Sequence, residues 1–207
     1  MSSYHAASRA LQDRFDTRGL ADRLDTRFVQ GSVIDPPDKD FIERVDMFFI
    51  ATADQDGRPQ CNYKGGQPGF VRVLDERTLA FPSYDGNGMY LSAGNIQVNP
   101  QVGLLFIDFE RQKRLKINGT AAVELDDPLI EHYPGAQFVV RVTTAEVFAN
   151  CQRYVHHYEL VERSPFVPAA ETQAPVVDWK RKPIFRDVLP ADDPARHQSV
   201  LHGIEDE

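Results

Sequence analysis

The sequence predicts a mainly β fold with peripheral helices, in which short strands close into an antiparallel barrel. Three observations support this prediction. Short apolar, β-branched runs recur between residues 47 and 148. Turn signals such as Asp56-Gly57 join successive runs, and few helical patterns come between them. Short strands at this spacing are typical of a closed antiparallel barrel.

Residues 1–40 predict an N-terminal helical extension. Apolar residues recur at near-helical spacing over 6–15, and every four residues over 20–28. Asp35-Pro36-Pro37-Asp38 is expected to form a loop, after which Asp38 or Asp40 caps a helix over the following residues.

Residues 41–163 predict the barrel domain, built largely from hairpins. Along 114–121, apolar and polar residues alternate, as in a strand with one buried face. Short helices are expected over 89–98 and 126–132. The expected strands cover residues 47–53, 58–63, 70–74, 78–81, 102–109, 114–124 and 137–148.

Residues 164–207 predict an extended tail, because the segment is rich in proline and poor in apolar residues. Trp179 is the single tryptophan of the chain and lies in this tail. An isolated tryptophan usually docks on other groups. We expect it to pack on its own barrel or across a dimer.

The composition argues against a nucleic-acid or membrane partner. The formal net charge is −8, so nothing offsets phosphate repulsion over the whole surface. No apolar run is long enough to cross a bilayer, and the N-terminus shows no secretory signal. We therefore expect a cytoplasmic protein, with Cys61 and Cys151 as reduced thiols.

A turn over 82–88, followed by the short helix over 89–98, is the most informative local feature. Such a turn frees backbone N–H groups at a helix N-terminus, which is a common way to hold a phosphate. The pattern differs from the dinucleotide-binding motif, because Gly86-Asn87-Gly88 lacks the third glycine and has Leu91 in its place.

An ordered series of motifs resembles the pyridoxamine 5′-phosphate oxidase-like family of FMN-binding split barrels. Within it, the sequence is most similar to the group called predicted flavin-nucleotide-binding proteins. The resemblance covers most of residues 41–182. The motifs that carry it are Phe49-Ile50-Ala51-Thr52-Ala53, Asp56-Gly57-Arg58-Pro59, Lys64-Gly65-Gly66, Leu79-Ala80-Phe81-Pro82, Asp85-Gly86-Asn87, Gly94-Asn95-Ile96, Asn99-Pro100, Ile117-Asn118-Gly119, the run 147–154 and Asp178-Trp179-Lys180.

The resemblance implies a six-stranded antiparallel split β-barrel that forms a homodimer, with FMN in a groove between the two subunits. It makes Lys64 the best candidate for the FMN phosphate, and Gly65 and Gly66 would let backbone approach closely. Ser83 and nearby backbone would bond the edge of the flavin ring. The full set of implied cofactor-binding residues is Asn62, Lys64, Gly65, Gly66, Pro82, Ser83, Tyr84, Asn87, Gly88, Met89, Arg114, Lys116, Asn150, Cys151 and Trp179.

Two departures from the family pattern bear on function. Relatives carry a basic residue near Gly88-Met89, where this chain has no cation before Arg111. Arg114 or Lys116 could supply the charge, or could belong to a solvated charge run. The residues that grip pyridoxamine phosphate in the oxidase are not identifiable here, so vitamin B6 oxidation is not expected.

The leading hypothesis is an FMN-dependent oxidoreductase that takes electrons from a reduced nicotinamide. No catalytic residue is assigned, because the flavin itself carries the electrons. Three alternatives stay open: a non-catalytic flavin-binding protein, a deazaflavin reductase, and a haem-handling protein. His132, His156 or His157 would be the axial ligand in the last case. No metal site is expected.

Overall fold

The computed structural model describes residues 4–28, 31–169 and 174–201. The chain divides into two compact units, Met1–Glu162 and Arg163–Glu207. The first unit contains the sheet and the helices α1 to α4, and the second contains three short 3-10 helices.

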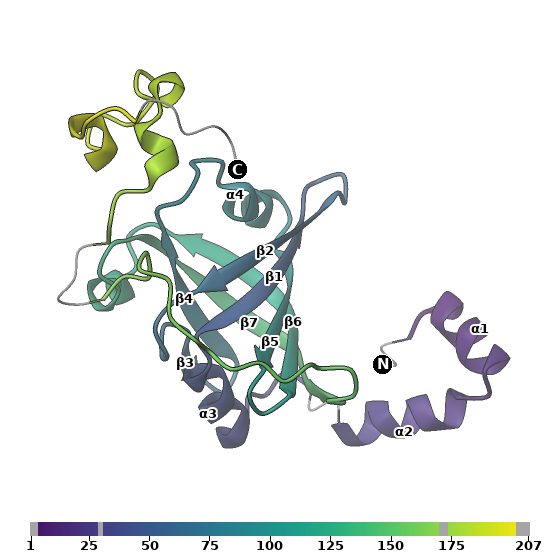
Figure 1. Cartoon of the computed structure of the whole chain (residues 1–207). Helices are drawn as coiled ribbons and strands as arrows, with labels where there is room; N and C mark the ends of the chain where they lie inside the picture. The colour runs from purple at the N-terminus through teal and green to yellow at the C-terminus, as the bar shows by residue number, and fades with distance from the viewer. Residues whose placement is uncertain (1–3, 29–30, 170–173, 202–207) are drawn as a thin grey trace. The chain divides into compact units, whose positions relative to one another are not determined.

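The fold is an antiparallel split β-barrel, and one seven-stranded sheet forms it in the order β2-β1-β5-β6-β7-β4-β3 (Figure 1). The sheet has the seven strands expected from the sequence pattern, one more than the six that the family resemblance implied. The short strand β3 adds to the sheet, because a tight turn at Asp75 folds it back on β4, with the Arg77 amide donating to Asp75 Oδ1 at 2.8 Å. The strands are β1 Met47–Ala53, β2 Pro59–Gly65, β3 Arg72–Asp75, β4 Thr78–Tyr84, β5 Gln101–Asp108, β6 Lys113–Glu124 and β7 Ala136–Asn150.

Alternating side chains of these strands build the main core. On β5 every second residue is buried, and the same alternation runs through the first half of β6. Phe48 lies at the centre, with its ring centroid 4.9 Å from that of Phe81 and 5.0 Å from that of Phe106. We call the face of the sheet that carries these rings the inner face.

The helix α3, Pro36–Arg44, packs against β3 and buries Phe41 and Ile42. Its N-cap is Asp35, whose Oδ1 accepts the Asp38 amide at 2.8 Å. The expected cap at Asp38 or Asp40 was wrong. The helix begins earlier because two prolines fit its first positions, where a missing N–H costs nothing.

The helix α4, Leu91–Val98, lies at the other end of β1 from α3 (Figure 1). It contacts β1, β2 and β6. Two polar contacts fix it to the sheet: Asn62 Nδ2 donates to Ser92 Oγ at 2.9 Å, and Asn95 Nδ2 donates to Thr52 Oγ1 at 3.0 Å.

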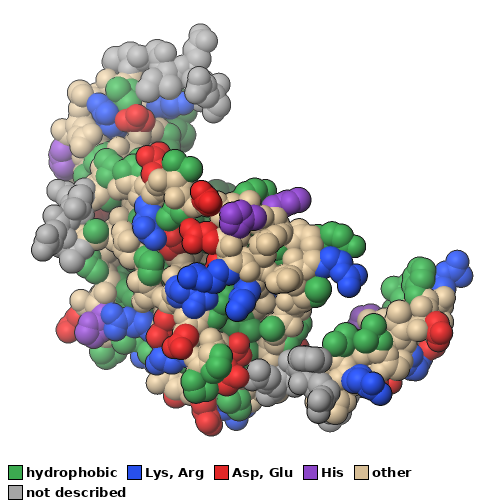
Figure 2. Space-filling model, turned by 60° about the horizontal axis from the view of Figure 1, so that its bottom comes forward, with side chains coloured by type: hydrophobic (Ala, Val, Ile, Leu, Met, Phe, Trp, Pro, Cys, Tyr) green, Lys and Arg blue, Asp and Glu red, His purple; other side chains and the backbone are tan. Residues whose placement is uncertain are grey.

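The N-terminal helices α1, Ala6–Arg14, and α2, Arg18–Phe28, form a helical hairpin. Ion pairs stabilise it, between Arg9 and Asp22 at 2.6 Å and between Arg18 and Asp13 at 2.5 Å. Hydrophobic side chains on these helices are exposed, as Figure 2 shows: they include Leu11, Phe15, Leu20 and Leu24. No helix in the described ranges is both long and apolar enough to span a membrane.

The described part of the C-terminal unit is more structured than an extended tail. It forms the 3-10 helices η2 Asp178–Arg181, η3 Pro183–Phe185 and η4 Pro194–His197. A buried ion pair joins two of them, with Lys180 Nζ 2.8 Å from Asp193 Oδ2. Trp179 docks within this unit, edge-on to Phe185 at a centroid distance of 5.2 Å.

Candidate functional site

The strand β2 places Lys64 and Asn62 on the inner face of the sheet. In the β1–β2 ladder, Lys64 lies opposite Phe48 and Asn62 lies opposite Ile50. Residues directly opposite one another in an antiparallel pair share a face. Because Phe48 and Ile50 belong to the buried core, Lys64 and Asn62 point to the same side.

The ammonium group of Lys64 is half-buried and makes no hydrogen bond or ion pair with any described residue. Burial lowers the pKa of Lys64 below the ordinary lysine value. A desolvated charge without a partner is costly, and a bound anion would remove much of that cost. Lys64 therefore has the properties of an anion-binding residue.

Ser83 on β4 shares this inner face. It lies opposite Phe138, which belongs to the main core, and two residues after Phe81. The contact between the rings of Phe48 and Phe81 connects β1 and β4 across the interior. The structure thus brings Lys64, Asn62 and Ser83 to the same face of the sheet.

The N-terminus of α4 adjoins this group through the Asn62–Ser92 hydrogen bond. Its N-cap residue, Tyr90, has a left-handed backbone with φ 48° and gives no side-chain cap. In the turn before it, Gly88 has φ 74°, and the Met89 amide donates to Asn87 Oδ1 at 3.1 Å. A helix N-terminus without a side-chain cap offers N–H donors and a positive dipole end to an anion.

Pro82 and Tyr84 do not join Ser83 on the inner face. Pro82 lies opposite Val139, which packs in a second, smaller core with Ala80 and Tyr133. Burial raises the pKa of Tyr133 to about 12, and an electrostatic interaction with Tyr84 adds to the rise. Burial also raises the pKa of Tyr84. Tyr84 pairs with Ala136, which packs against this second core.

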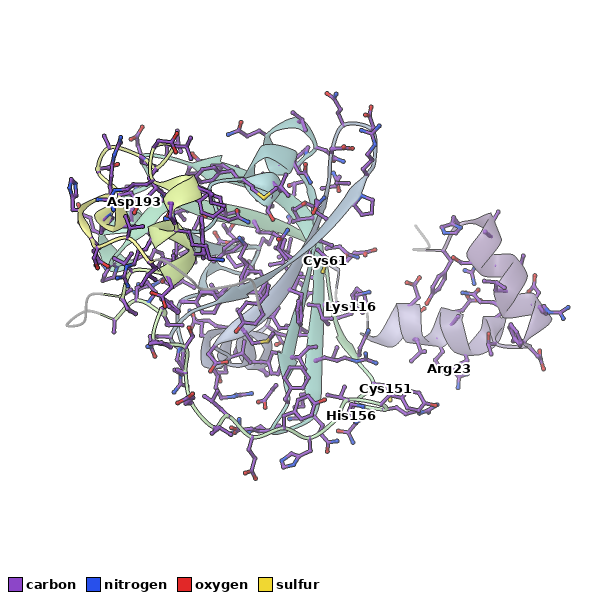
Figure 3. All side chains as sticks on the ribbon, turned by 45° about the horizontal axis from the view of Figure 1, so that its top comes forward. Arg23, Cys61, Lys116, Cys151, His156 and Asp193 are labelled. Atoms are coloured by element: carbon purple, nitrogen blue, oxygen red, sulfur yellow. The ribbon has the colours of Figure 1, made fainter. Side chains whose placement is uncertain are left out.

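Arg114 and Lys116 lie on the outer face, opposite in direction to Lys64. Their neighbours Leu115 and Ile117 point into the core, so alternation directs the two cations outward. Arg114 Nε donates to the carbonyl of Cys151 at 2.9 Å, and Lys116 Nζ lies 5.2 Å from the ring centroid of Phe148. Figure 3 labels Lys116 on β6 and Cys151 beyond the end of β7. Within one chain, neither cation joins Lys64.

An outer row of partly exposed side chains crosses the sheet beside Lys116. The ladder aligns Tyr63, Phe49, Leu105, Lys116 and Phe148. The rings of Phe49 and Tyr63 meet edge to face at a centroid distance of 6.0 Å, and Tyr63 is 61% exposed. The sequence motifs did not indicate Tyr63 and Phe49 as site residues, although Phe49 alternates with the buried Phe48 and Ile50 of its strand. Tyr63 alternates with half-buried polar residues instead.

The two glycines after Lys64 have packing roles. A side chain on Gly66 would collide with the ring of Phe70, and a Cβ on Gly65 would lie 2.8 Å from the ring of Tyr63. Because both positions lack a side chain, the rings of Phe70 and Tyr63 can pack against the backbone there.

Three predicted residues, Asn150, Cys151 and Trp179, are not connected to the Lys64 group by any described contact. Asn150 ends β7 opposite Arg114, and Cys151 is exposed. Trp179 belongs to the C-terminal unit. In the described part of the chain, no group of three or more His, Cys, Asp or Glu is arranged to hold a metal.

Comparison with known proteins gives one family. The model described as pyridoxamine 5′-phosphate oxidase matches residues 34–157, more than half of the chain. No curated protein sequence matches the chain.

Solved structures with a similar fold come from several bacteria. HupZ of Group A Streptococcus is 19% identical, with a TM-score of 0.45, over 58% of this chain and 95% of that one. HutZ of Vibrio cholerae, described as a heme storage protein, is 22% identical, with a TM-score of 0.41, over 56% and 94%. An FMN-binding protein of Syntrophomonas wolfei is 8% identical, with a TM-score of 0.42, over 68% and 97%. All three TM-scores lie below 0.5. The family assignment therefore rests on the family model that matches residues 34–157.

Proposed function

Because this chain belongs to the pyridoxamine 5′-phosphate oxidase family, we propose that it binds FMN and acts as an FMN-dependent oxidoreductase on a small molecule. The observation that carries the proposal is the half-buried Lys64 ammonium group, which has no partner among the described residues. The phosphate of FMN is the anion that would complete this site.

The residues around Lys64 fit a phosphate. Lys64 would supply the positive charge, and the first turn of α4 would supply backbone N–H donors. Ser83, on the same face of the sheet, would bond the edge of the flavin ring. The turn over 85–90 contains no Lys or Arg, unlike that of relatives. With one cation fewer in this turn, FMN binding is expected to be weaker than in the family.

We propose that the flavin ring lies between two copies of the chain. The outer row with Tyr63, Phe49 and Leu105 is apolar and partly exposed, which suits a subunit contact. In such a dimer, Arg114 and Lys116 of one copy would face the cofactor groove from the outer face. Their positive charge would then add to that of Lys64 across the interface.

The flavin, when bound, supplies the hydride and electron chemistry. In this proposal the chain binds and orients it: Lys64 holds the phosphate, and the aromatic rings of the outer row exclude water from the ring. A reduced nicotinamide is the proposed electron donor. Pyridoxamine phosphate is not proposed as the substrate, because its binding residues are not identifiable.

The test is FMN uptake by purified protein, followed by visible absorption after desalting. Lys64→Gln is expected to weaken FMN binding about tenfold or more, as for loss of a hydrogen bond to a charged group. Lys113→Gln removes the same charge from an exposed position at the start of β6 and should leave binding unchanged. Equal effects of the two changes, or no uptake by the wild type, would overturn the assignment.

Two further measurements distinguish the alternative functions. Bleaching of the bound flavin by NADPH or NADH under anaerobic conditions supports an oxidoreductase, and failure of both donors leaves a flavin-binding protein. A Soret band after haem addition, without FMN uptake, would replace the proposal with haem handling.

A further inference from the structure

We propose that the C-terminal unit carries a second anion site, one that binds a phosphate monoester or free phosphate. The site is a depression of about 750 Å³ lined by Pro183, Arg186, Asp187, Ala191, Arg196 and His197. It lies wholly within that unit and does not depend on the flavin proposal.

The two arginines are held in place by the backbone rather than by acids. Arg186 Nη1 donates to the carbonyl of Gln198 at 2.9 Å, and Arg196 Nη1 donates to the carbonyl of Leu189 at 3.1 Å. Both are half-buried. A guanidinium group has five N–H donors, so each keeps donors for a ligand.

Neither guanidinium group lies within 4 Å of a carboxylate oxygen among the described residues. Arg141 and Arg181 behave differently, since they pair with Asp127 and Asp178. Two partly desolvated cations that share one depression repel each other unless an anion lies between them. This arrangement is typical of an oxyanion site.

The scaffold of the depression is fixed by the buried Lys180–Asp193 pair. Asp193 Oδ2 accepts from Lys180 Nζ at 2.8 Å, and its Oδ1 accepts the Ala195 amide at 2.9 Å. Asp193 thereby caps η4, the helix that carries Arg196 and His197; Figure 3 labels Asp193. The cations are therefore positioned before any ligand arrives.

The chemistry of the lining suits a phosphoryl group. Planar guanidinium groups bind phosphate oxygens in pairs, and the exposed His197 can add a ring N–H. Asp187 is the one acid of the lining, so the two arginines leave an excess of positive charge.

The test is calorimetric titration of the full-length protein with inorganic phosphate, in a buffer free of other oxyanions. The Lys64→Gln background weakens the phosphate site proposed for FMN. In that background, saturable binding is expected to persist and to weaken about tenfold with Arg196→Gln or Arg186→Gln. Asp187→Asn should tighten binding about threefold, a gain that misfolding cannot mimic.

Arg153→Gln is the matched control, because Arg153 is exposed in the other unit, and it should change nothing. Trp179 is the sole tryptophan and lies in the C-terminal unit, so its fluorescence reports whether each variant stays folded there. Absence of saturable binding in the Lys64→Gln background, or no effect of Asp187→Asn, would overturn the proposal. Titration with AMP distinguishes the two possible ligands. If AMP binds as tightly as inorganic phosphate, the ligand is free phosphate. If AMP binds more tightly and this binding needs Arg196, the ligand is a phosphate monoester.

Discussion

Lys64 lies directly opposite Phe48 in the β1–β2 ladder, so a half-buried ammonium group shares a face with a fully buried aromatic ring. The core around Phe48 and the proposed phosphate site therefore lie on the same face of neighbouring strands. A change at Lys64 should alter both stability and flavin binding, with opposite signs.

The stability of the flavin-free protein should depend on pH through Lys64. Burial lowers its pKa below 10.5 in the folded chain, so in the window between the lowered pKa and 10.5 the unfolded chain binds more protons. The unfolding free energy then rises with pH across that window. Lys64→Met is expected to be more stable at pH 7 by less than about 1 kcal/mol, since Lys64 is only half-buried. Urea denaturation should show this difference shrinking as pH approaches 10.5. A difference that stays constant or grows would contradict it, and Lys113→Met is the control.

Gly119 should tolerate no side chain. A Cβ there would collide with the backbone carbonyl of Thr143, at the bulge where the β6–β7 register shifts. Gly119→Ala is expected to lower the unfolding free energy by about 3 kcal/mol. Gly103→Ala is the matched change on β5, where the added Cβ would make ordinary contacts at 3.5 and 3.9 Å. Similar denaturation midpoints for the two variants would show that the bulge relaxes.

Tyr133→Phe should leave the protein as stable or slightly more stable. The Tyr133 hydroxyl is buried and makes no hydrogen bond of ordinary geometry with a described residue, and the Arg72 guanidinium lies 5.4 Å from the centroid of its ring. A buried polar group without a partner costs about 1–3 kcal/mol, and part of that cost would be recovered. Thermal unfolding measures the effect. A loss of more than about 1 kcal/mol would mean that the hydroxyl has a solvent partner.

Breaking the Lys180–Asp193 pair should unfold the C-terminal unit and spare the barrel. Lys180→Met leaves the buried Asp193 carboxylate without its cation, at a cost of about 3–5 kcal/mol. Trp179 fluorescence should then shift to the red, while flavin uptake and the cooperative unfolding of the sheet are unchanged. Lys180→Met/Asp193→Leu should recover part of the native fluorescence. A loss of flavin uptake in the single variant would show that the two units depend on each other.

Local sequence patterns were enough to predict the strands and the family. Alternation along β5 and β6, the Asp56-Gly57 turn and the ordered motifs are local signals, because side-chain direction repeats every two residues within a strand. The same alternation showed that Arg114 and Lys116 share one face of β6. The family resemblance, with the two glycines that follow, made Lys64 the candidate for the phosphate.

Which face of each strand lies inside the barrel depends on the tertiary structure. Alternation sets which residues of one strand share a face, whereas the register with β1 and β5 decides whether that face is inside or outside. Register therefore placed Lys64 on the inner face and Lys116 on the outer face. In the C-terminal unit, the pairing of Lys180 with Asp193 closes a turn that no periodic pattern marks, and this turn brings Arg186 and Arg196 to one depression.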